Sequence, residues 1–367
     1  MDFDQFKEVI KDSIKEYLPK DYENASVEIK DVIKNNDTHL SGLTIRDEGT
    51  SIAPTLYLED FYSQYEGGKD MDDILAHMAD VYDEAARDGL SFDKENLVNQ
   101  LTDYEATKDK IIPRVVNKES NEERLKGMPH TDMGDLAITY HVDLGDSDGG
   151  QMSVAVSNEM MDKYGVSVSE LHDQACKNME EVSPTSFETM IETLANLMIP
   201  DYENMTSEEK AEARAEFDMP DPGMYVLSNG NKSFGAAAML DTDTMDKIRE
   251  EVGDFYILPS SVHEVLIVPK REDMHLSDLE AMVQEVNATQ VAPNEVLSDH
   301  VYEYDPETKE IFRADKAAEH MKEKEASKET EKERPSLKAK LEEKKKEVKE
   351  AKREDKTKEL SKDMGRG

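Results

Sequence analysis

Cysteine and long apolar runs are almost absent from this chain of 367 residues. Cys176 is the only cysteine, so no disulfide can form within the chain. No apolar run approaches the roughly 20 residues that a helix needs to cross a bilayer. The N-terminus has neither the basic start nor the apolar core of a signal peptide. These absences predict a cytoplasmic protein with no membrane partner.

The common sequence motifs of enzymes are also missing. The chain has no glycine-rich phosphate loop, no CxxC pair and no nucleophile elbow. Nothing in the sequence therefore calls for a cofactor or a bound metal. The sequence favours a non-enzymatic protein without excluding an enzyme.

Positive charge is scarce relative to negative charge. The chain has 45 Lys and Arg against 84 Asp and Glu, a net charge of -39. Residues 314–367 carry +3, which leaves -42 for residues 1–313, the acidic body. Such a body repels nucleic-acid phosphates and anionic membranes. The sequence thus predicts a protein partner, a basic one, and no direct binding of nucleic acid by the body.

The most apolar stretch of this polar sequence runs from Met224 to Pro269. Residues 234–240 are apolar on both faces, which predicts a central strand, and residues 265–268 predict a second one. Between them Met245, Ile248 and Val252 recur at helical spacing. This stretch predicts a sheet with a helix packed on it.

The remaining elements follow from similar patterns and from capping and turn residues. We expect helices that carry Phe3 to Leu18, Leu171 to Val182, Phe187 to Leu197 and Leu279 to Val286, the second and fourth preceded by the capping boxes Ser167/Glu170 and Ser277/Glu280, and hairpins at 135–156 and 301–313. The fold class predicted is α+β, with mostly antiparallel sheets and packed amphipathic helices.

Composition divides the chain into five predicted regions. They are an N-terminal α+β region at 1–125, a hairpin-plus-helices region at 126–200, a linker at 201–222, a C-terminal α+β region at 223–313 and a charged tail at 314–367. Leu337, Leu341 and Val348 are too few to bury a face of the tail. The tail is predicted to be helical or disordered, and dispensable for folding.

A series of sequence blocks in fixed order carries a family resemblance. The blocks are "IIPRVVN", "LAITYHVDL", "SVAVSNEMMDKYGVS", "YVLSNGNKSFGAAAMLD", "FYILPSSVHEVLIVP" and "VLSDHVYEYDPETKEIFR". Over residues 1–313 the chain resembles an uncharacterised family of domain-of-unknown-function proteins from Gram-positive gut bacteria. The tail, with "RPSLKAKLEEKKKEVKEAKRE", is similar to the ends of proteins carried on conjugative elements. The resemblance implies a mobile-element setting, but no activity, cofactor or catalytic residue.

Two His-x-Asp pairs are the candidate catalytic residues. His130 and Asp132 precede His141 and Asp143 by eleven residues, and such pairs occur in metal-dependent hydrolases. The alternation of Leu136, Ile138, Tyr140 and Val142 instead puts His141 and Asp143 on the opposite, solvated face of a half-buried strand. We expect His141 and Asp143 to be exposed on this solvated face, and a metal-dependent hydrolase site remains the alternative.

Two further pairs of reactive side chains have simpler interpretations. His172 and Cys176 stand four residues apart on one predicted helix, where they could act as base and nucleophile, but Cys176 flanks an apolar stripe and is expected to pack in the core. Ser261 and His263 lie in the connection between two core strands, where such residues usually form turns.

The sequence as a whole favours a non-enzymatic acidic module that binds a protein. Its charge is suited to a decoy or docking surface for a basic nucleic-acid-binding protein, because an acidic surface can imitate a phosphate array. The alternative function is a metal-dependent hydrolase that uses the paired His-x-Asp segments.

Overall fold

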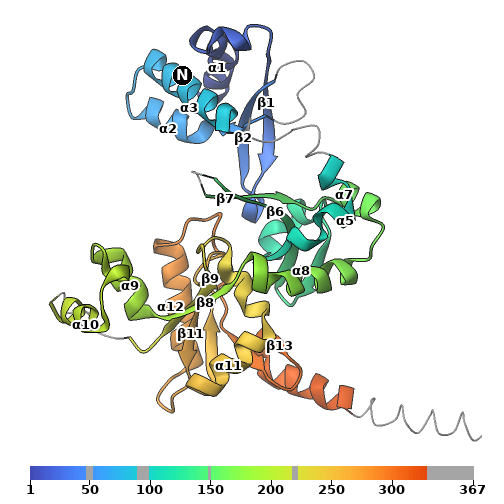
Figure 1. Ribbon diagram of the computed structural model, residues 1–367, viewed down its shortest axis with the longest axis vertical. Helices are drawn as coiled ribbons and strands as arrows, with labels where there is room; N and C mark the ends of the chain where they lie inside the picture. Colours follow the sequence, from blue (N-terminus) through green and yellow to red (C-terminus); the bar gives the residue numbers. More distant parts are fainter. Residues whose placement is uncertain (47–52, 89–98, 148–149, 217–221, 329–367) are drawn as a thin grey trace, which may run out of the picture.

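The computed structural model describes residues 1–46, 53–88, 99–147, 150–216 and 222–328. In these ranges the fold is α+β, as predicted, and every paired strand is antiparallel (Figure 1). Three sheets are formed by the described residues. None of the helices described there is long and apolar enough to pass through a bilayer.

The first sheet and its helices form the N-terminal end of the molecule. Its elements are α1 (Phe3–Tyr17), β1 (Ser26–Ile33), β2 (His39–Arg46), β3 (Leu56–Tyr57), α2 (Leu58–Glu66) and α3 (Met71–Asp88), with the short turn η1 (Lys20–Tyr22). The predicted opening helix is confirmed: Asp2 caps it, and Phe6, Ile10 and Ile14 are fully buried. Its hydrophobic cluster draws only on residues 3–86, so this end has a core of its own.

The middle sheet has the order β4-β6-β5, with β7 also paired to β6. Its elements are α5 (Tyr104–Thr107), η4 (Lys108–Lys110), β4 (Ile111–Asn117), η5 (Glu119–Asn121), α6 (Glu122–Leu125), β5 (His130–Met133), β6 (Leu136–Ser147), β7 (Gly150–Ala155), α7 (Asn158–Tyr164) and α8 (Val168–Val182). The predicted hairpin is β6–β7. The predicted capping box of Ser167 and Glu170 is confirmed at the start of α8.

The third sheet is the largest, with the order β13-β12-β10-β11-β9-β8. Its strands are β8 (Thr185–Thr189), β9 (Tyr225–Asn229), β10 (Phe255–Leu258), β11 (Val265–Pro269), β12 (Tyr302–Asp305) and β13 (Glu310–Arg313). The accompanying helices are α9 (Met190–Met198), η6 (Tyr202–Asn204), α10 (Ser207–Glu216), η7 (Gly235–Leu240), α11 (Thr242–Val252), α12 (Leu276–Thr289) and η8 (Ala314–Lys316). Strand β11 lies inside this sheet, with Val265 and Ile267 fully buried, as predicted.

Three local predictions are wrong. Residues 235–240 form the 3₁₀ helix η7 and not a central strand. A short run that is apolar on both faces can be buried either as a central strand or as a short helix between two sheets, and here it is the helix. Phe187 lies on strand β8, and the helix begins only at Met190. Ser277 and Glu280 are inside α12, which begins at Leu276 after His275, so they form no capping box.

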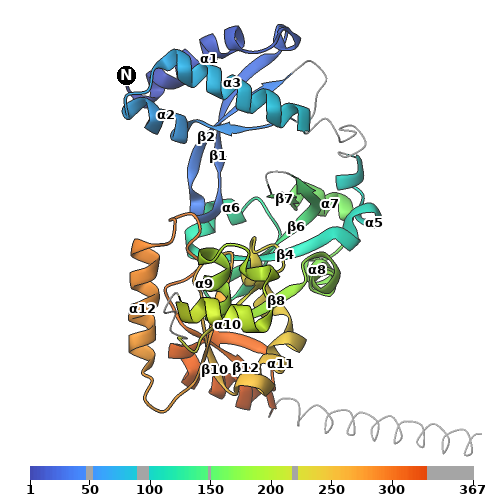
Figure 2. The same ribbon diagram turned by 60° about the vertical axis from the view of Figure 1, so that its left-hand side comes forward.

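The N-terminal end reaches the rest of the molecule through the tip of the β1–β2 hairpin (Figures 1 and 2). The tip is η2 (Asn35–Asp37), where Asn36 donates to the carbonyl oxygens of Pro293 and Val296, both at 2.8 Å. The backbone N–H of Asn36 also donates to Asn121 at 2.9 Å. Polar contacts of the tip therefore join the first sheet to both of the others.

The charged tail begins with a segment that packs on the third sheet. Residues 317–328 are helical, Ala314 and His320 are buried, and the His320 ring stacks on Phe312 with centroids 3.9 Å apart. His320 and Lys324 contact the Asp305 carboxylate at 3.0 and 2.6 Å, and they hold the pKa of Asp305 below its usual range against the opposing effect of burial. The prediction that the tail has nothing to bury is therefore wrong for residues 314–328. The rest of the tail lies outside the described residues.

This packing revises the expected effect of truncation. A chain that ends at residue 328 should melt at the same temperature as the full chain. A chain that ends at residue 313 should melt roughly 5 °C lower, a shift that calorimetry resolves easily in a chain of this size, because it loses the His320 stack and uncovers Asp305. Equal melting temperatures for the two truncated chains would show that the segment contributes nothing to stability.

Candidate functional site

The four His-x-Asp candidates lie on neighbouring strands. His130 and Asp132 are on β5, which pairs with β6 so that His130 faces Thr139, two residues before His141. In the part of the chain that the structure describes, no three of the four candidates bring ligand atoms close enough to share an ion. Asp132 contacts the Lys118 ammonium at 2.7 Å instead. The geometry does not assemble a hydrolytic metal centre from these residues.

His141 corrects the expectation of a solvated strand face. Its side chain is only 3% exposed, and burial, with further help from Arg114 and Arg124, lowers its pKa well below the ordinary value. Arg114 is buried beside it and lies over the Phe234 ring, 3.6 Å from the centroid. The alternation of β6 was correct, but its polar face is covered by other parts of the chain. His141 is therefore buried and neutral and does not lie on a solvated face.

His172 and Cys176 are brought together at a pocket of about 540 Å³ between α8, β5 and the C-terminal segment. The Cys176 Sγ lies 3.7 Å from the His172 Nε2, and the His172 Nδ1 is 3.2 Å from the Tyr140 hydroxyl. Burial raises the pKa of the Cys176 thiol to about 11, with help from Asp173 and Asp241. The thiol is therefore protonated at neutral pH and is a poor nucleophile, since thiolate is the reactive form.

The His263 side chain stabilises the backbone at the start of η7. Its Nδ1 accepts the backbone N–H of Phe234 at 3.2 Å, and its Nε2 lies 3.4 Å from the Glu295 carboxylate. The Ser261 hydroxyl accepts the backbone N–H of His263 at 3.0 Å. Phe234 needs this support because its φ of +52° is unfavourable for a bulky side chain. Both ring nitrogens of His263 are thus used in holding the loop.

The most unusual surface feature is the apolar face of α9. Three of the six large apolar side chains that are exposed in the described ranges lie there: Leu194 at 37%, Leu197 at 79% and Met198 at 57%. Residues three and four apart share one side of a helix, so these side chains form a single stripe. Scattered exposed apolar residues need no explanation, but a grouped set indicates an interaction surface.

The other side of α9 fixes it to α10, and residues 190–216 form a projecting arm. Ala195, Ile199 and Tyr202 make a small buried cluster between the two helices. Arg214 of α10 forms an ion pair with Glu192 and donates to the Tyr202 hydroxyl at 2.9 Å. In Figure 1 the arm stands out at one side of the third sheet. The stripe is therefore presented on a folded element.

The arm is strongly acidic. It has seven acidic residues and only two basic ones, a net charge of -5 over 27 residues. Both basic side chains are occupied, Arg214 by Glu192 and Lys210 by the Tyr202 ring, 5.0 Å from its centroid. The exposed acidic residues are Asp201, Glu203, Glu208, Glu209, Glu212 and Glu216. The arm that carries the apolar stripe thus has negative charge that its own cations do not neutralise.

Sequence reasoning missed this surface for an identifiable reason. The helix with Leu194 and Leu197 was predicted without a statement of which of its faces is exposed, and residues 201–222 were predicted to be an acidic linker with one exposed helix. A usable signal was present, because α9 has apolar residues on two sides, Ala195 and Ile199 on one and Leu194 and Leu197 on the other. A following helix as polar as α10 cannot cover both sides.

Comparison with known proteins places the chain among proteins whose role is not known. The family described as "Family of unknown function (DUF5688)" matches residues 3–306. No curated protein and no solved structure matches the chain. The resemblance to a family of unknown function is thereby confirmed over nearly all of the acidic body.

Proposed function

We propose that this chain, which belongs to the DUF5688 family of unknown function, is an acidic protein-binding module whose α9–α10 arm binds a basic amphipathic segment of a partner protein. The observation that carries the proposal is the exposed stripe of Leu194, Leu197 and Met198 on an arm of net charge -5. No catalytic constellation competes with it among the described side chains, since the Cys176 thiol is protonated and the His-x-Asp residues share no ion site.

The chemistry of the arm selects the partner. An apolar stripe with side chains three and four residues apart suits the apolar face of an amphipathic helix, which binds through side chains at similar spacing. Exposed carboxylates on the same arm favour a partner that carries Lys and Arg and disfavour an acidic partner. A basic nucleic-acid-binding protein has such segments, so we extend the proposal to a docking or decoy role toward this class. The tail resembles the ends of proteins carried on conjugative elements, and a protein of such an element would encounter host DNA-binding proteins as partners.

The test uses two synthetic helical peptides with the same leucine spacing, one with lysine and one with glutamate at every polar position. The lysine peptide should bind the full chain, measured by fluorescence anisotropy, and the glutamate peptide should not. Affinity should fall steeply between about 50 and 150 mM salt, because screening weakens exposed charge pairs. Duplex DNA should compete for the lysine peptide.

Substitution of the stripe should weaken this binding. The double variant Leu194→Ser, Leu197→Ser is expected to bind the lysine peptide at least tenfold less tightly, since a few central apolar residues dominate most interfaces. Its melting temperature should not change much, because both side chains are exposed. The matched control is Met321→Ser, which replaces a 52% exposed apolar residue outside the arm. Equal affinity of the double variant and the control would contradict the proposal.

A further inference from the structure

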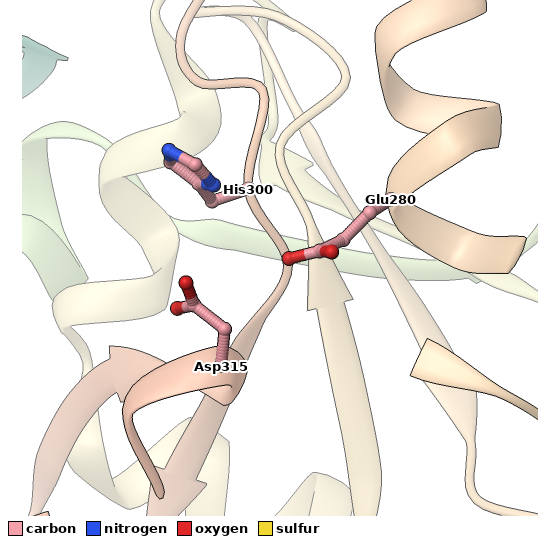
Figure 3. A group of neighbouring side chains, drawn as sticks. All are labelled: Glu280, His300 and Asp315. Atoms are coloured by element: carbon pink, nitrogen blue, oxygen red, sulfur yellow. The ribbon is translucent and has the colours of Figure 1, made fainter. Parts of the chain in front are cut away.

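Three side chains that are far apart in the sequence converge at one point of the third sheet (Figure 3). Glu280 comes from α12, His300 from the loop before β12, and Asp315 from η8. One ligand atom from each lies within 4.8 Å of the other two. It is the sole group of its kind among the described residues.

The spacing of these atoms fits an ion better than direct contact. Among these three described side chains, no two form a hydrogen bond or an ion pair. Their ligand atoms are therefore close together without being in direct contact. Zinc binds histidine nitrogen and carboxylate oxygen at about 2.0–2.2 Å in a tetrahedral arrangement, so two ligand atoms of one ion are about 3.3–3.6 Å apart. Side-chain rotations that shorten these separations by about 1 Å would bring all three ligand atoms into coordination distance of one ion.

The surroundings hold the ligands as the outer shell of a metal site does. The Arg313 guanidinium donates to both oxygens of Asp315, at 2.9 and 2.7 Å, and this contact lowers the pKa of that carboxyl. The backbone N–H of His300 donates to the Ser298 hydroxyl at 3.1 Å. Metal-binding carboxylates are commonly hydrogen-bonded in this way, which fixes their orientation. Asp135, 3.9 Å from Arg313, partly offsets the positive charge of Arg313 near the site.

We propose that Glu280, His300 and Asp315 bind one zinc ion, with water in the fourth position. One nitrogen and two carboxylate ligands suit a divalent transition metal, and zinc binds such sites more tightly than manganese does. The three ligands come from α12, from the chain entering β12 and from the start of the C-terminal segment. The ion is therefore a clip that fastens the segment at 314–328 to α12.

The test is titration of the full chain with zinc chloride after treatment with a chelator and dialysis. Calorimetry should show one ion per chain, and saturating zinc should raise the melting temperature, because an ion that binds only the folded state stabilises it. The variants His300→Ala and Glu280→Gln should bind zinc at least tenfold less tightly. Loss of a residue that only hydrogen-bonds to a ligand typically costs tenfold or more in affinity, and loss of the ligand itself should cost no less. Their melting temperatures without zinc should match that of the unchanged chain.

His39→Ala is the control, because His39 is another histidine that lies between two carboxylates. Its two ring nitrogens lie 2.6 Å from Asp31 and 3.3 Å from Glu123, on an exposed surface. The control should keep the stoichiometry, affinity and thermal shift of the unchanged chain. Loss of zinc in His39→Ala, unaltered binding in His300→Ala, or a site that takes manganese but not zinc would each overturn the assignment.

Discussion

Replacing Gly235 with alanine is expected to destabilise the protein by at least about 3 kcal/mol, the upper end of the cost of overpacking a core. A Cβ at this position would lie 2.1 Å from the Ser228 Oγ, 2.5 Å from the backbone nitrogen of Asn229 and 2.7 Å from the carbonyl oxygen of His263. Two of these atoms belong to the backbone and cannot rotate away. The added methyl group must therefore push η7 out of its place between the middle and third sheets.

Denaturant unfolding of the Gly235→Ala protein is the measurement, with Gly230→Ala as the matched control from the same loop. A Cβ on Gly230 would meet its nearest atoms at 3.8 and 3.9 Å, both in Pro184, which is ordinary van der Waals contact. The control should keep the stability of the unchanged chain. If the two variants are equally stable, η7 is not packed as described.

Replacing Ile267 with aspartate is expected to abolish cooperative unfolding. Ile267 is fully buried on β11, paired with Ile257 on one side and Tyr225 on the other, inside the six-stranded sheet. An unpaired buried charge costs several kcal/mol, against a total stability of about 5–15 kcal/mol for a typical domain. The variant should lose the cooperative transition in circular dichroism and expose apolar surface.

Leu197→Asp is the control for this prediction, because it also replaces an aliphatic residue with aspartate but at a site that is 79% exposed. It should unfold cooperatively at nearly the same temperature as the unchanged chain. A soluble Ile267→Asp protein with a normal transition would show that β11 is peripheral, in conflict with its place in the sheet.

The candidate sites show where pattern reasoning reaches its limit. The alternation of Leu136, Ile138 and Tyr140 correctly predicted β6, since strand periodicity is a local property of the chain. It could not show that the opposite face, with His141, is covered by Arg114 and neighbouring segments. The sequence predicted the helix that carries Leu194 and Leu197 but could not show that this face is uncovered, because an apolar helical face has the same pattern whether or not another element covers it.

The sequence by itself determined the features that depend on neighbours along the chain. These are the α+β class, the capping box of Ser167 and Glu170, the opening helix and the charge of the acidic body. Tertiary structure alone decided which surfaces are covered and which distant side chains meet. Glu280, His300 and Asp315 are separated by 20 and 15 residues, and they converge only because α12, β12 and η8 pack together. Local preferences act over a few residues, whereas burial and ligand geometry depend on contacts between segments that no local pattern encodes.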